Sequence, residues 1–112
     1  MKTGQTNLVI DLPNSKYNIW QFEMIAEIFK SISFPVRLQI LDILSNVDRM
    51  TVGQLAEYTS LDHSLLSHHL QKMKHSGVLE SVREGRYIFY SLKLKKIISI
   101  FHCIDKCEIF NQ

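Results

Sequence analysis

The chain has 112 residues, a mass of 13.1 kDa and a formal charge of +2, which fits one domain rather than two. A hydrophobic content of 46% excludes a wholly disordered chain, and only two cysteines exclude a disulfide-stapled secreted scaffold. No segment reaches the roughly 20 apolar residues of a membrane helix, and no signal-peptide core is found, so we expect a cytoplasmic protein with reduced thiols.

The N-terminal third of the chain predicts an arm followed by two helices. Residues 1–14 are mostly polar, so we expect a flexible N-terminal arm there and a single domain over 15–112. Apolar residues at helical spacing predict a first helix over about 15–32. Ser33-Phe34-Pro35 then separates it from a second helix, because proline disfavours a helical residue before it and suits the first turn of a new helix.

Capping signals mark the next two helices. Thr51 and Gln54 have the spacing of a capping box, which predicts the start of a third helix. Asp62 is well placed to cap a fourth helix, and Gly77 to end it in the left-handed conformation. The apolar stripe of this fourth helix has the i, i+4, i+7 spacing of Leu66, Leu70 and Met73.

The pattern changes after the fourth helix. Val78–Arg83 and Arg86–Leu92 are rich in β-branched and aromatic residues and flank Glu84-Gly85, which predicts a hairpin with that two-residue turn. A last helix is expected from about Lys93 to Phe110. Four helices, a β-hairpin and a closing helix make a mainly α chain with the layout of a winged helix-turn-helix.

A basic segment coincides with the fourth helix and the hairpin. Residues 61–96 carry seven lysines and arginines against three carboxylates, which favours an anionic partner. The fourth helix has no carboxylate after Asp62, so its polar face suits a DNA major groove. Base contacts are expected from His63, Ser64, Ser67 and His68. Phosphate contacts are expected from Lys72, Arg83 and Arg86. Glu84 at the tip either faces phosphates, which speaks against DNA, or pairs with Arg83 or Arg86 and holds the tip in shape.

Other classes of function fit less well. The chain has no glycine-rich phosphate loop, no paired carboxylates at useful spacing and no nucleophile elbow, so we expect no enzyme. A winged helix that contacts another protein is the rival interpretation. An apolar or acidic face on the fourth helix would favour it, and Leu65 is the one residue there that does.

The same elements resemble a known family. The matching stretches are Phe34–Leu41 (FPVRLQIL, similar to a D-P-x-R-x-x-I-L opening), Gln54–Ala56 with Leu65–Leu70, Gly77–Leu79, and Arg83–Leu92. Over about residues 20–105 the chain resembles winged-helix repressors of the ArsR/SmtB type.

This resemblance implies a homodimeric repressor of transcription that leaves its double-stranded DNA operator when an inducer signal arrives. In this family the first and last helices, here about 15–32 and 93–110, usually form the dimer interface. A twofold dimer would present its two fourth helices roughly 34–36 Å apart, which favours an inverted-repeat operator. A repressor without a small-molecule or metal inducer is the alternative.

The family's usual metal sites are not expected in this chain. The stretch matching the family's Cys-x-Cys site, residues 48–53, contains neither cysteine nor histidine. Lys93–Lys96 brings positive charge to the start of the last helix, where a second family site binds cations. Cys103 and Cys107 remain, one helical turn apart. They suit packing, a thiol switch or a metal shared with a partner chain, and we favour packing without a cofactor.

Overall fold

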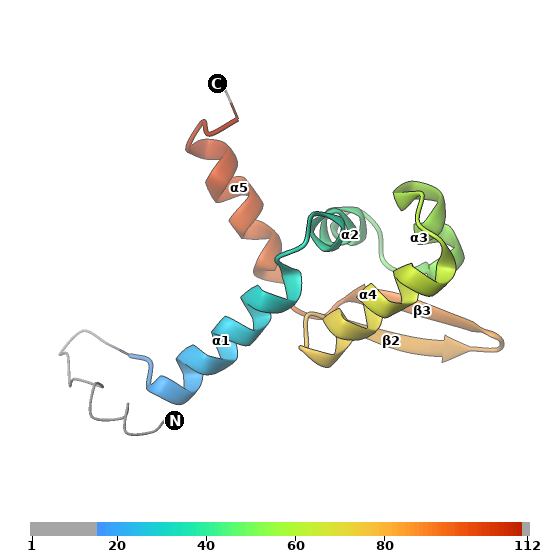
Figure 1. The fold of residues 1–112 in the computed structure, drawn as a ribbon, viewed down its shortest axis with the longest axis horizontal. Coiled ribbons are helices and arrows are strands. Elements are labelled where there is room, and N and C mark those ends of the chain that lie inside the picture. The colour runs from blue at the N-terminus through green and yellow to red at the C-terminus, as the bar shows by residue number, and fades with distance from the viewer. Residues whose placement is uncertain (1–15, 111–112) are drawn as a thin grey trace.

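Helices and strands follow the predicted order, with one short strand added (Figure 1). The computed structural model describes residues 16–110, and the predicted arm (1–14) lies outside them. The elements are α1 (Ile19–Ile32), α2 (Pro35–Ser45), β1 (Met50–Thr51), α3 (Val52–Thr59), α4 (His63–His75), β2 (Leu79–Glu84), β3 (Tyr87–Leu92), the 3-10 helix η2 (Lys95–Ile98) and α5 (Ser99–Lys106). The predicted winged helix-turn-helix fold is therefore confirmed, while the division into an arm and one domain stays a prediction.

Side-chain caps set the start of three helices. Asn18 and Gln21 form a capping box, so α1 begins at Ile19 and not at the predicted residue 15. The predicted capping box of α3 is confirmed, with Thr51 and Gln54 each accepting from the other's backbone N–H. The Asp62 carboxylate accepts from the backbone N–H of Leu65 at 2.7 Å and caps α4, as predicted.

The sheet has three antiparallel strands in the order β1-β3-β2. Sequence reasoning misses β1, because a strand of two residues shows no alternation of its own. The predicted turn is displaced by one residue: Glu84 pairs with Tyr87, so the two loop residues are Gly85 and Arg86 and not Glu84 and Gly85. Gly85 has φ +65°, the positive value that a type II′ turn requires at its first loop residue.

The core lies where α2, α3 and α4 pack on one face of the sheet. The predicted stripe of α4 is confirmed, because Leu66, Leu70 and Met73 are all fully buried. Gly77 follows α4 with φ +89°, and the Val78 N–H donates to the Met73 carbonyl, so the chain turns directly into β2.

The closing helix is shorter than the predicted range of Lys93–Phe110. Lys93 and Leu94 donate backbone hydrogen bonds to the Val78 carbonyl, which keeps them beside the sheet and delays the first helical turn. At the other end, Glu108 adopts a left-handed φ of +57°, and α5 ends at Lys106.

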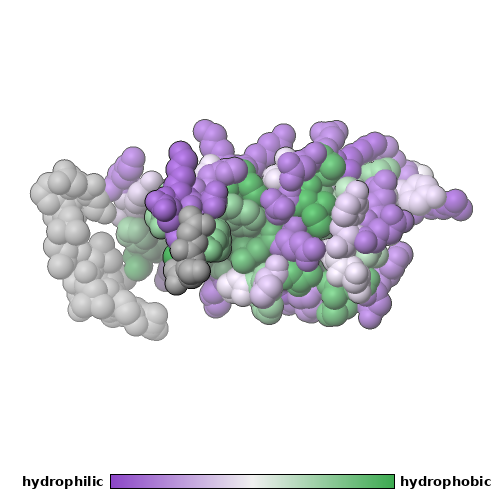
Figure 2. Space-filling view, turned by 90° about the horizontal axis from the view of Figure 1, so that it is seen from above, coloured by the Kyte–Doolittle hydropathy of each residue, from purple (hydrophilic) through white to green (hydrophobic). Residues whose placement is uncertain are grey.

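The two terminal helices leave the core in different directions (Figure 1). Only Ile32 of α1 is buried, α5 has no buried residue, and Ile97 of η2 joins α5 to the core. Seen from above, apolar surface lies open on both sides of the end of α5 (Figure 2). Across residues 16–110, no helix has the length and apolar character of a membrane span.

Candidate nucleic-acid interface

The outer face of α4 lies opposite its buried stripe. Ser64, His68, Gln71 and His75 recur at i, i+4, i+7 and i+11, which places them on one line along the helix, and all four are exposed. Two of the predicted base-reading residues, Ser64 and His68, therefore stand on this line. Sequence reasoning misses Gln71 and His75, although the spacing that identifies the buried stripe also identifies them.

The other predicted residues of α4 stand at the edges of this face. A β-carbon at Gly53 would lie 3.7 Å from Cε1 of His63, so this imidazole borders the start of α3. Ser67 is half-buried and lies one helical turn before Gln71, which bonds to Tyr90 of β3. Lys72 is exposed on one flank of the helix, where it lines a hollow of about 450 Å³ between α1 and α4 with Lys30 and His75.

The wing, formed by β2, β3 and their loop, places both predicted arginines at its tip. Arg83 is exposed and pairs with Ile88, on the same sheet face as Tyr90 and α4. Arg86 lies in the loop itself. Its guanidinium stacks over the Tyr87 ring at 5.3 Å and donates to the Tyr87 hydroxyl at 3.2 Å. The wing thus adds two exposed cations beside the outer face of α4.

Glu84 pairs with neither Arg83 nor Arg86, which corrects the prediction. Both of its carboxylate oxygens accept hydrogen bonds from the two terminal nitrogens of Arg49, at 2.8 and 2.9 Å. The Arg49 guanidinium also stacks over the Phe89 ring at 4.0 Å. The hydrogen bonds and the charge of Arg49 lower the pKa of Glu84. The loop before β1 is thereby tied to the wing tip, and the carboxylate faces a cation.

A buried arginine of α2 joins α4 to α1. Arg37 is only 6% exposed; its Nε donates to Nδ1 of His69 at 2.9 Å and its Nη1 to the Ser31 carbonyl at 2.8 Å. Its guanidinium also stacks over the Phe34 ring. His69 must be unprotonated at Nδ1 to accept this bond. Burial, then the charges of Arg37 and His68, lower the pKa of His69. His69 is therefore a positioning residue of α4.

Acidification is expected to destabilise the protein through His69. Its folded-state pKa lies below the ordinary 6.5 that the unfolded chain keeps, so the unfolded state takes up the proton first. The stability that this histidine contributes is present above about pH 6.5 and is lost as the pH falls below it. Thermal unfolding at about pH 7.5 and about pH 5.5 measures the loss. His69→Gln keeps an oxygen acceptor for Arg37, so its thermal stability is expected to fall less between the two pH values than that of the wild type. An equal fall in both proteins would contradict this assignment.

Both cysteines are exposed on one helical turn. Cys103 lies in α5 and Cys107 caps its C-terminus. Neither thiol is packed in the core of its own chain, so packing of these residues would need a second chain. Within residues 16–110, no three histidine, cysteine or acidic side chains come together as a metal site.

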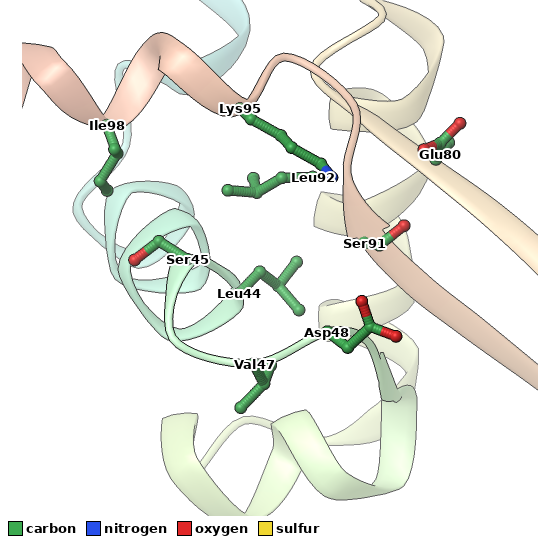
Figure 3. Close-up of a pocket in the computed structure, with 9 residues that line it drawn as sticks. All are labelled: Leu44, Ser45, Val47, Asp48, Glu80, Ser91, Leu92, Lys95 and Ile98. Carbon is green, nitrogen blue, oxygen red and sulfur yellow. The ribbon is translucent and has the colours of Figure 1, made fainter.

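A second hollow lies between the end of α2, η2 and the ends of β2 and β3 that lie away from the wing tip. It has a volume of about 390 Å³, and Leu44 and Leu92 project into it between Asp48 and Lys95 (Figure 3). Glu80 and Ser91 border it from β2 and β3, where they alternate with residues of the α4 face. Lys95 is therefore a basic residue outside the candidate interface.

Comparisons with known proteins agree with this geometry. Residues 35–81 match the family described as bacterial regulatory protein, arsR family. The transcriptional repressor SdpR of Bacillus subtilis is 43% identical over 65 residues, which cover 58% of this chain and 71% of that protein. The transcriptional repressor PagR of Bacillus anthracis superposes with a TM-score of 0.68 at 32% identity, covering 76% of this chain and 97% of that one. A homodimeric winged helix-turn-helix DNA-binding domain from Mycobacterium bovis has a TM-score of 0.71 at 25% identity, with 85% and 87% covered.

Proposed function

The chain belongs to the ArsR family of bacterial regulatory proteins, and from that premise we propose that it is a sequence-specific, DNA-binding repressor of transcription. One observation carries the proposal. The outer face of α4 is exposed, has no carboxylate and continues into a wing whose tip holds Arg83 and Arg86. A polyanion with a groove wide enough for a helix fits this surface.

The proposed contacts divide into base-reading and backbone contacts. Short side chains in the first half of α4 suit base edges in the major groove, and they are His63, Ser64, Ser67 and His68. Lys72 lies on one flank of α4, and Arg83 and Arg86 lie on the other. Because the two strands border the groove on opposite sides, cations on both flanks would meet phosphates of both strands.

We propose that the repressor is a homodimer formed through α1 and α5. The exposed apolar side chains of these segments support this interface: Trp20, Phe22, Met24, Ile25, Phe29, Ile104, Ile109 and Phe110. A mainly apolar hollow of about 460 Å³ between α2 and α5 adds to them. The Mycobacterium bovis neighbour is described as homodimeric. Twofold symmetry would favour an inverted-repeat operator with half-sites about 34–36 Å apart.

Binding of the purified protein to DNA from its own promoter region tests the proposal. Selective binding that exceeds binding to random DNA of equal length supports a repressor. Selection of an inverted repeat from randomised DNA would identify the operator. Absence of binding to any DNA would contradict the proposal and favour a winged helix for protein contact, for which exposed Leu65 on α4 is the supporting observation.

The same assay decides whether an inducer acts through the two cysteines. Operator binding is measured with reduced protein, with oxidised protein and with added zinc. A change in affinity that both Cys103→Ala and Cys107→Ala abolish would identify a thiol-based sensor. An unchanged affinity in every condition would leave a repressor whose cysteines take no part in induction.

Replacing Arg86 by alanine is expected to weaken binding to every DNA sequence. Each lost phosphate contact lowers the slope of log K against log salt by about one, so a dimer that loses one contact in each half-site is expected to lose about two. Lys95→Ala removes the same charge from η2, which lies away from α4's outer face and the wing tip, and is the matched control, with an unchanged slope expected. Ser67→Ala is expected instead to change the preference among operators. An Arg86→Ala slope equal to that of the wild type would contradict the wing contact.

A further inference from the structure

Gln71 is the one residue on the outer line of α4 that is bonded to the wing. Its amide nitrogen donates to the hydroxyl of Tyr90 on β3, with 3.2 Å between the two atoms. Gln71 is itself exposed, whereas Tyr90 is only 2% exposed. The amide is therefore held at one point by a group that solvent barely reaches.

This bond fixes which way the amide presents its donors and its acceptor. Burial raises the pKa of Tyr90, so its hydroxyl stays protonated and uncharged at neutral pH. The Gln71 nitrogen carries two hydrogens, and the bond to Tyr90 uses one of them. With Tyr90 bonded to the hydrogen trans to the carbonyl oxygen, the cis N–H and that oxygen are left as a neighbouring donor and acceptor.

That donor and acceptor match the edge of adenine in the major groove. Adenine offers N7 as an acceptor beside its N6 amino donor, and a glutamine side chain bonds both. Resting on the proposed DNA-binding function, we propose that Gln71 reads an adenine in each operator half-site and that Tyr90 positions its amide. Ser64 and His68 lie on the same line nearer the start of α4, so this adenine follows the bases that they contact.

A change of base preference tests the role of Gln71. Selection from randomised half-sites is carried out with the wild type, with Gln71→Lys and with Gln39→Lys. Lysine bonds guanine, so Gln71→Lys is expected to exchange one adenine for guanine, with discrimination between the two changed about 5- to 150-fold. Gln39→Lys adds the same charge on α2, where Gln39 donates to the Tyr58 carbonyl. This control variant is expected to select the same adenine as the wild type.

Tyr90→Phe tests positioning without removing the ring from the core. The variant keeps Gln71 but leaves its amide untethered, so preference for adenine is expected to fall about 2- to 10-fold, with the salt slope unchanged. A merely structural role for Tyr90 would lower the thermal midpoint and leave the base preference as it was. That result would overturn the positioning role.

The outcomes separate this inference from the proposed function. If the wild type selects no DNA sequence, the proposed function fails and the inference fails with it. If the wild type selects a half-site and Gln71→Lys retains the same base at every position, only the inference fails. An adenine that becomes guanine in Gln71→Lys alone supports both.

Discussion

Replacing Leu70 by alanine is expected to lower the free energy of unfolding by about 2–5 kcal/mol. Leu70 is 0% exposed in the middle of the α4 stripe, so the substitution removes buried apolar surface and leaves a cavity. A loss of this size is a large part of the stability of a small domain. Urea unfolding at one fixed protein concentration measures it.

The matched control lies on the same helix. Leu65→Ala removes the same atoms from a side chain that is 45% exposed, and its effect on stability is expected to stay within about 0.5 kcal/mol. A loss for Leu70→Ala as small as that of the control would contradict the placement of α4 against the core.

Placing a charge on α1 or α5 is expected to dissociate the proposed dimer. Phe29 is 50% exposed on α1 and Ile104 is exposed on α5, so Phe29→Asp or Ile104→Asp would bury a carboxylate in an apolar interface. Loss of the second half-site contact is expected to weaken operator binding by about 100-fold or more. Light scattering after size exclusion measures the mass, and a titration with operator DNA measures the affinity.

Tyr58→Asp is the control for this pair. Tyr58 is an exposed residue of α3, which lies at the far end of the molecule from α1 and α5 (Figure 1). The variant is expected to keep the mass of the wild type. Dimers of unchanged stability in both Phe29→Asp and Ile104→Asp would exclude these helices from the interface.

Features that depend on neighbouring residues are predictable from this sequence. The capping pair Thr51 and Gln54, the cap Asp62 and the left-handed Gly77 are each formed within a few residues, and the structure confirms all of them. The apolar stripe of α4 is read from its spacing for the same reason. The winged-helix order follows from these local signals.

Features that join distant residues are not predictable in this way. Arg49 and Glu84 are 35 residues apart, and Arg37 and His69 are 32 apart. Composition does not identify which of several cations a carboxylate meets, so the sequence alone points to Arg83 and Arg86, the neighbours of Glu84, and not to Arg49. The displacement of the hairpin turn has the same origin, since the pairing of Glu84 with Tyr87 is set across the sheet.

The bond between Arg49 and Glu84 bears on how salt acts on the wing. Both side chains are solvent-exposed, so added ions screen their attraction over the same range of concentration in which they compete for phosphates. Loosening of the wing then accompanies counterion release. We therefore expect the measured salt dependence to contain a conformational contribution, with a slope steeper than the roughly 0.9 per phosphate that the contacts alone would give.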